Sequence, residues 1–153
     1  MVYSLLPLTE EGLLPAGTDV DRIVDRGDER ELNALLASYF RRRGDLRRLA
    51  EGVLSEPQFV HDELDRIAPV SAMQALRANQ RLAEIALTSR WIFIRDAREE
   101  GASWSAVGAA LGMTKQAAWS WYREQIERQE NLPPEFHPEA DRARRVLVDE
   151  DPA

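Results

Sequence analysis

The sequence predicts an all-α protein: a helical bundle in which one long central helix leads into two helices near the C-terminal end. Apolar side chains recur at the i, i+3, i+4 spacing of amphipathic helices through much of the chain. Residues 72–100 contain neither glycine nor proline and can form one uninterrupted helix. No alternating apolar hairpin follows the last of these segments, which argues against a β-wing.

Length and composition restrict the possible functions. A chain of 153 residues with 44% hydrophobic content suits one domain, or a small domain with an appended module. It has no cysteine, which excludes disulfides, a thiol nucleophile and thiolate metal ligands. No window approaches the eighteen apolar residues of a membrane span, so we expect a cytoplasmic protein without membrane contact.

The net charge of −7 argues against a protein that simply coats nucleic acid. The charge is uneven: residues 1–69 hold nine basic and fourteen acidic side chains, residues 70–130 eight and seven, and residues 131–153 three and six. The middle region is therefore the only one that is not acidic. A local patch there can still bind DNA, with modest affinity per monomer, which favours a dimer or a protein partner.

Residues 1–69 are predicted to form an N-terminal helical region for dimerisation or for binding a partner or ligand. Residues 1–18 mix prolines and glycines with Leu5, Leu6, Leu8, Leu13 and Leu14. They form either an arm that packs on the core or on another subunit, or a frayed terminus. One or two helical turns follow at residues 19–26.

Residues 28–54 read as a helical hairpin with one continuous apolar face. Asp28 and Glu31 have capping-box spacing, and Gly44 is the predicted end of the first helix. Asp45 is the predicted N-cap of the second. Arg41, Arg42 and Arg43 then lie at a helix C-terminus, where a solvated cap is favoured over nucleic-acid contact.

A further helix is predicted to begin at Pro57, because proline fits the first helical position. His61 lies beside Asp62, Glu63 and Asp65, a group that can bind a metal or supply a base. With no second histidine or cysteine nearby, a surface histidine is the favoured interpretation.

The long helix is predicted to start at the Ser71–Gln74 capping box and to span about 45 Å. Its second half is apolar on most sides, which predicts burial on most sides, and its length suits a dimer interface. Arg95 and Arg98 either reach a phosphate or form ion pairs with nearby acidic residues.

Two helices with a tight turn follow in the predicted domain of residues 70–130. Ser103 is the N-cap of a short helix over residues 104–111, and Gly112 ends that helix. Thr114 is the N-cap of a second helix over residues 114–128. Gly108 stands where a larger side chain would push the two helices apart.

Residues Trp104–Arg123 resemble a bacterial helix-turn-helix DNA-binding motif of the form WxxVGxALGMTKQAAxxW, common in regulators of high-GC bacteria. The resemblance covers these twenty residues only. It implies a non-winged helix-turn-helix whose second helix lies in the major groove. Ala118 departs from the motif, because many members carry a larger aliphatic residue there, and Trp119 or Trp121 would have to replace its packing.

The outward face of the second helix supplies the candidate DNA contacts. Gln116 can pair with an adenine edge, and Lys115 or Arg123 with a guanine or a phosphate. Trp119 is expected either to meet a thymine methyl or sugar, or to pack on a partner. The complete set of candidate contacts is Ser103, Ser105, Thr114, Lys115, Gln116, Trp119, Ser120 and Arg123. The three hydroxyl residues that flank the helix starts would bind phosphates. The alternative is an ordinary αα-hairpin in a helical core.

Residues 131–153 are predicted to form a linker, a short helix over residues 139–148 and a disordered tail. This end can dock on a partner or cover the DNA-reading face.

No phosphate loop, nucleophile elbow or metal-binding helix motif is present, so no enzyme, cofactor or metal is expected. The leading hypothesis is a sequence-specific regulator that binds double-stranded DNA as a homodimer. One alternative is a protein-interaction module, such as an antitoxin, adaptor or phage-encoded inhibitor, whose acidic N-terminal region binds a protein partner. Another is a DNA-packaging or replication-associated binder with little sequence preference.

Overall fold

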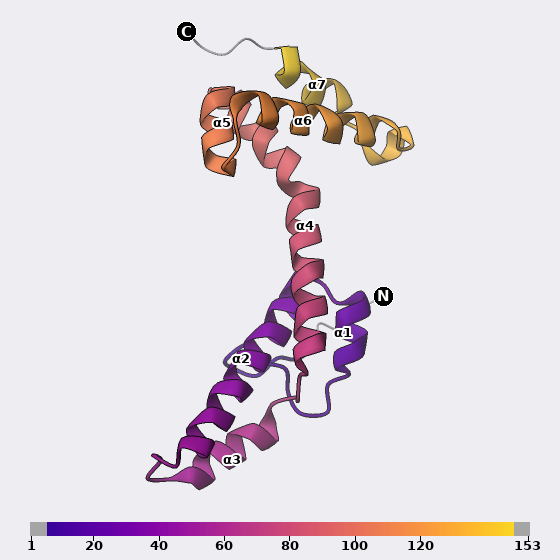
Figure 1. Cartoon of the computed structure of the whole chain (residues 1–153). Coiled ribbons are helices and arrows are strands. Elements are labelled where there is room, and N and C mark those ends of the chain that lie inside the picture. The colour runs from indigo at the N-terminus through magenta and orange to yellow at the C-terminus, as the bar shows by residue number, and fades with distance from the viewer. Residues whose placement is uncertain (1–5, 149–153) are drawn as a thin grey trace. The chain divides into compact units, whose positions relative to one another are not determined.

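The computed structural model describes residues 6–148, and its elements are helical (Figure 1). They are α1 (Val20–Arg26), α2 (Glu29–Glu51), α3 (Pro57–Arg66), α4 (Ala72–Glu99), α5 (Trp104–Leu111), α6 (Lys115–Glu130), the 3-10 turn η1 (Pro134–Phe136) and α7 (Ala140–Val148). No strand occurs in this range, so the all-α prediction is confirmed. Leu5 and the predicted tail, residues 149–153, lie outside the described residues.

The chain divides into two compact units, Met1–Ile85 and Ala86–Ala153. The division falls inside α4, which begins in the first unit and ends in the second. Each unit has its own apolar core.

The arm before α1 is part of the first unit's core. Leu14 is fully buried; its backbone N–H donates to the Ser38 hydroxyl at 2.8 Å, and its carbonyl accepts from the Ala68 amide at 2.9 Å. Pro15 forms an isolated antiparallel bridge with Ile67. These bonds satisfy backbone groups that a buried arm would otherwise leave unpaired. A packed arm is therefore confirmed over a frayed end for the described part.

Helix α2 runs without a break through Gly44, so the predicted hairpin over residues 28–54 is wrong. The capping box of Asp28 and Glu31 is present, but the helix ends only at Gly52, which adopts a left-handed φ of 66°. Asp45, the expected N-cap, lies buried within the helix and pairs with Arg48. One glycine inside a helix costs about 1 kcal/mol, which its neighbours can offset.

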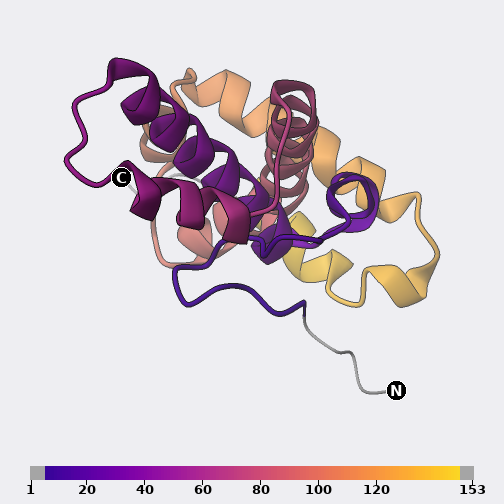
Figure 2. The same ribbon diagram turned by 90° about the horizontal axis from the view of Figure 1, so that it is seen from below.

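The arginine triplet consequently lies in the middle of a helix, and the predicted solvated cap is wrong. Helix α3 runs back along α2, as Figure 2 shows. The Arg42 guanidinium donates to the carbonyls of Leu64 and Ile67 at 2.5 and 2.9 Å, where α3 ends. Arg41 donates to Glu63 at 2.5 Å, and this bond raises the pKa of Arg41 above its usual value. Arg41 and Arg42 thus attach α3 to α2.

Helix α4 starts at the predicted capping box, in which the Ser71 hydroxyl accepts from the Gln74 amide at 3.1 Å. Ala78 is fully buried against α1 and α2, and Ile94 is buried in the core of the second unit. In the second half of α4, for which burial on most sides was predicted, the large apolar side chains of Leu87 and Phe93 remain exposed. That prediction is therefore wrong for these two residues within this chain.

The core of the second unit gathers residues from four helices. Its buried members are Ile94, Trp104, Val107, Ala118, Tyr122, Ile126, Ala143 and Val146. Helices α5 and α7 both pack on α6, and Tyr122 of α6 contacts both of them. The predicted short helix near the C-terminal end thus belongs to the core that holds α6.

Candidate nucleic-acid interface

Capping residues set the start of α5, the turn and the start of α6. The Ser103 hydroxyl accepts from the Ala106 amide at 3.0 Å, and the Thr114 hydroxyl accepts from the Ala117 amide at 3.1 Å. Gly112 ends α5 with a left-handed φ of 65°. All three positions match the prediction, and α6 extends two residues beyond its predicted end at residue 128.

Gly108 lets the turn pass close over α5. A Cβ atom on Gly108 would lie 2.8 Å from the Met113 carbonyl oxygen and 3.0 Å from two backbone atoms of Thr114. Such contacts are too short for any side chain, so glycine is required at this position. The close neighbour is the turn backbone and not the second helix itself.

Ala118, the departure from the motif, is fully buried. In its cluster the largest fully buried side chain is Tyr122, whose ring centroid lies 5.6 Å from that of Trp104. Trp119 and Trp121 are only partly buried there. The pair Tyr122 and Trp104 therefore supplies the large buried side chains of this core, a role that the sequence analysis gave to Trp119 or Trp121.

Three candidate contact residues share one outward face of α6. Gln116, Ser120 and Arg123 follow at intervals of four and three residues, which places them on one side of a helix. Gln116 and Arg123 are exposed, and Ser120 is half-buried. The Gln116 amide donates to the Ser120 hydroxyl at 3.3 Å. Together they form a polar stripe opposite the buried face, called here the α6 stripe.

Trp119 lies at the edge of the α6 stripe and is half-buried. Its indole N–H donates to the Leu147 carbonyl at 3.3 Å, so α7 holds it in place. The Arg123 guanidinium stacks over the Trp119 ring at 5.0 Å and lies 3.7 Å from Glu127. The Trp119 ring thus holds the Arg123 guanidinium in place through this stacking contact.

The remaining candidates flank the helix starts. Lys115 is exposed in the first turn of α6, and Ser105 is exposed in the first turn of α5. Ser103 and Thr114 use their hydroxyl oxygens as caps. Each hydroxyl proton can still be donated, because a cap occupies only the acceptor side of the group.

Charge divides α6 into two halves. Residues 115–123 contain Lys115 and Arg123 and no acidic residue. The second half carries Glu124, Glu127 and Glu130, which pair with Arg128, Arg123 and Arg144 respectively. The first half, where the dipole is also positive, is therefore the part suited to an anionic partner.

Two bidentate ion pairs and one buried hydrogen bond fasten α7, an attachment that the sequence analysis did not predict. Arg142 donates to both Glu99 oxygens at 2.7 and 2.6 Å, and this bond holds the pKa of Glu99 below its usual value. Arg144 does the same for Glu130. The Tyr122 hydroxyl donates to the Ala143 carbonyl at 2.6 Å. The only signal in the sequence was the apolar spacing of Ala143, Val146 and Leu147.

Arg95 and Arg98 are buried and engaged within the chain. Arg95 donates to Asp96 at 2.9 Å and to Glu139 at 3.2 Å. Arg98 donates to the Ala102 carbonyl at 2.6 Å and lies 5.1 Å from the Trp104 ring. Their predicted reach to a phosphate is not supported, and the ion-pair alternative holds for Arg95.

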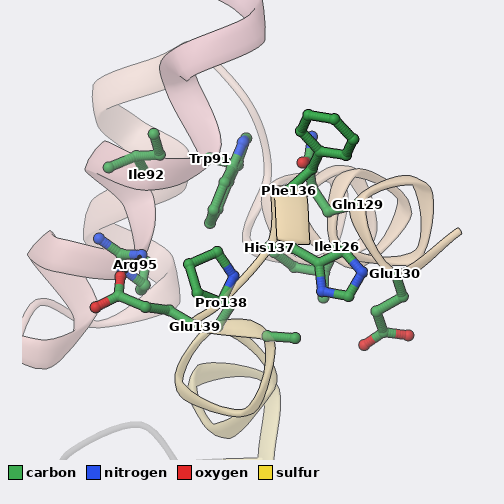
Figure 3. A pocket seen from close by; sticks show the side chains of 12 residues that line it. Trp91, Ile92, Arg95, Ile126, Gln129, Glu130, Phe136, His137, Pro138 and Glu139 are labelled. Atoms are coloured by element: carbon green, nitrogen blue, oxygen red, sulfur yellow. Dashed lines mark hydrogen bonds and ion pairs between the residues drawn. The ribbon is translucent and has the colours of Figure 1, made fainter. Parts of the chain in front are cut away.

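A small hollow of about 180 Å³ lies beside this network (Figure 3). Figure 3 shows the Trp91 ring and Pro138 beside it, with His137 and Phe136 on the other side. The His137 Nε2 atom lies 2.8 Å from the Leu132 carbonyl oxygen. The hollow offers chiefly apolar walls, and its buried arginine is already paired with carboxylates.

Among the described residues, no group of three or more histidine, cysteine or acidic side chains is arranged to hold a metal ion. His61 and its acidic neighbours on α3 therefore form no such group. Within residues 6–148, no helix combines the length and apolar character that crossing a membrane requires. No protein-family model, curated protein or solved structure matches this chain.

Proposed function

We propose that this chain is a sequence-specific DNA-binding protein that acts as a dimeric transcriptional regulator. In this proposal α5, the turn and α6 form a helix-turn-helix, and the first half of α6 enters the major groove. The α6 stripe carries the proposal, because it presents hydrogen-bonding side chains on a helix whose opposite face is fixed in a core.

The chemistry of the α6 stripe suits the edges of base pairs. A glutamine amide can donate to and accept from adenine, and an arginine can donate twice to guanine. Gln116 lies in the first turn of α6, and Arg123 lies two turns further along. The reading face therefore spans residues 116–123, which contain no acidic side chain.

Phosphate contacts would fix the register of the helix on the duplex. Ser105 and Lys115 are exposed at the starts of the two helices. Ser103 and Thr114, although they act as caps, retain hydroxyl protons that can be donated to phosphate oxygens. The net charge of −7 limits affinity per monomer, which favours two half-sites bound together.

Fluorescence anisotropy against duplexes tiled across the DNA that flanks the protein's own gene tests the proposal. The measurement is made at two salt concentrations. We expect one tile to bind far above the others, and Gln116→Ala to weaken that tile by about ten-fold or more. Gln58→Ala, an exposed glutamine on α3, is the matched control and should bind as the unchanged protein does.

Two other outcomes contradict the proposal and favour an alternative function. Equal binding to all tiles that vanishes with salt indicates a packaging or replication-associated binder. Absence of binding at both salt concentrations indicates that the fold serves a protein partner. The circular dichroism spectrum of Gln116→Ala must match that of the unchanged protein, so that a loss of DNA binding is not caused by unfolding.

A further inference from the structure

Helix α7 runs back along α6 toward the start of α6. The Tyr122 hydroxyl donates to the Ala143 carbonyl at 2.6 Å, and the Trp119 indole donates to the Leu147 carbonyl at 3.3 Å. Between these two bonds the α6 partner moves back three residues while the α7 partner advances four, so the helices run in opposite directions. Helix α7 ends at Val148, one residue after its contact with Trp119.

The residues that follow Val148 in the sequence carry a run of negative charge. Asp149, Glu150 and Asp151 are consecutive acidic residues, called here the acidic segment. Three residues of chain reach at most about 11 Å, whereas residues 115–119 of α6 cover about 6 Å of helix axis. The acidic segment is therefore long enough to reach the first half of α6 while α7 stays in place.

The surface within that reach is positively charged. Residues 115–123 contain Lys115 and Arg123 and no acidic residue, and both basic side chains are exposed. The Arg123 guanidinium stacks on the same Trp119 ring whose indole bonds to α7, so a positive charge lies beside the end of α7. Glu127 lies 3.7 Å from Arg123, whose side chain is half exposed, and a guanidinium has five N–H donors. Arg123 can therefore bind a second carboxylate.

The arginines of α7 are less suitable partners for the acidic segment. Arg142 donates to both oxygens of Glu99, and Arg144 donates to both oxygens of Glu130. Arg145 stands four residues before Asp149, which is the spacing of an ion pair within one helix. Pairing of the segment with Arg145 alone is therefore the alternative that an experiment must exclude.

We propose that the acidic segment binds the first half of α6 in the same chain and competes there with DNA phosphates. Its carboxylates offer this basic face the same sign of charge as a phosphate backbone. Because the segment is tethered beside that face, its effective concentration is on the order of millimolar. All of these elements belong to the second unit. The competition with DNA rests on the proposed function, whereas the contact itself is measured without DNA.

Carbodiimide cross-linking of the full chain tests the contact, because Lys115 is the single lysine of the sequence. The reagent joins a lysine amine to a carboxylate that lies against it. We expect an amide between Lys115 and the acidic segment in the product that keeps the mass of one chain, 17.4 kDa, located by mass spectrometry of its peptides. The yield should fall several-fold in about 1 M salt, where the Debye length shortens to about 3 Å.

A lysine moved along α6 is the matched control for this cross-link. Lys115→Arg combined with Arg128→Lys keeps every charge of α6 and places the lysine in the last turn of the helix, beside Glu124. This variant should form no amide with the acidic segment. Equal coupling of the segment to both positions would overturn the contact. Absence of coupling to Lys115 would also overturn it and would favour pairing with Arg145.

Neutralising the acidic segment tests the competition with DNA. Changing its three residues together to their amides should tighten binding to the preferred DNA tile at least ten-fold at low salt. The control variant Glu10→Gln, Glu56→Gln, Asp65→Asn removes the same charge from exposed sites of the first unit and should change affinity much less. Equal gains in the two variants would indicate an effect of net charge alone and would overturn the competition.

The contact and the proposed function fail separately. An amide between Lys115 and the acidic segment in a chain that binds no DNA would support the contact and contradict the proposed function. Specific binding of one tile by a chain that forms no such amide would overturn the contact and leave the proposed function standing.

Discussion

The Met113 carbonyl oxygen lies where a Cβ atom on Gly108 would approach to 2.8 Å. A hydrogen bond fixes the same turn to α5, because the Met113 amide donates to the Gly108 carbonyl at 2.8 Å. Neither partner can move away without breaking the end of α5. The spacing between α5 and the start of α6 thus depends on the absence of one side chain.

Gly108→Ala is expected to lower the free energy of unfolding by about 2 kcal/mol, since overpacking against backbone outweighs the gain in helix propensity. Urea unfolding followed by tryptophan fluorescence measures it, because Trp91, Trp104, Trp119 and Trp121 all lie in the second unit. Gly44→Ala, in the first unit, is the control and is followed by far-ultraviolet circular dichroism. Apart from its own helix backbone and chain neighbours, nothing lies within 4 Å of its Cβ position, so this change should stabilise by about 0.5–1 kcal/mol. Equal effects of the two changes would contradict this account.

Tyr122→Phe is expected to destabilise the second unit by about 1 kcal/mol, through loss of the bond to Ala143. Burial also raises the pKa of Tyr122 well above its ordinary value near 10. The contribution of the neutral hydroxyl is therefore complete below pH 10 and is lost as pH rises further. Urea midpoints at about pH 8 and pH 11 should converge between the two proteins at the higher pH. A constant difference across this range would contradict the assignment.

Acid is expected to loosen α7. Glu99 and Glu130 have lowered pKa values because Arg142 and Arg144 bind them, so their stabilisation is present above the ordinary glutamate pKa. It is lost as pH falls below the ordinary glutamate pKa and through the lowered values. Release of α7 removes the Leu147 carbonyl from the Trp119 indole, which should shift the fluorescence to longer wavelength.

The double variant Glu99→Gln, Glu130→Gln should give part of the same shift at neutral pH. Glu124→Gln is the control, because its ion pair with Arg128 lies within α6 and does not involve α7. If the double variant keeps the unchanged spectrum, the ion pairs do not hold α7. The effect is expected to be modest because all four partners are partly exposed to solvent.

Local signals allowed the sequence to predict much of the helical structure. Ser103, Gly112 and Thr114 cap their helices by bonding to residues at most four positions away in the chain. Such caps can therefore be predicted from the sequence. The same holds for Asp28 with Glu31.

Structure that depends on distant residues could not be predicted in this way. Gly44 was predicted to end a helix, but the bonds of Arg42 to carbonyls at the end of α3 favour a continuous helix. The attachment of α7 rests on pairs 14 and 43 residues apart in sequence, which no local pattern indicates. In the candidate site, Gln116 and Arg123 were placed on an outward face by periodicity alone. The support of Arg123 by Trp119 and α7 needed the structure.

Arg123→Ala is expected to weaken binding to the preferred DNA tile by about ten-fold or more, if the proposed function is right, because it removes a bidentate donor from the reading face. Arg128→Ala removes the same charge one to two turns further along α6 and should change affinity little, because Arg128 lies 2.6 Å from Glu124, whereas Arg123 lies 3.7 Å from Glu127. Anisotropy titrations of both variants at one salt concentration measure the contrast. Equal losses would indicate that α6 contributes charge alone, without reading bases.

Leu147→Pro, which breaks the end of α7, should reproduce part of the Arg123 effect, because the Trp119 ring that stacks on that guanidinium loses its hydrogen bond to the Leu147 carbonyl.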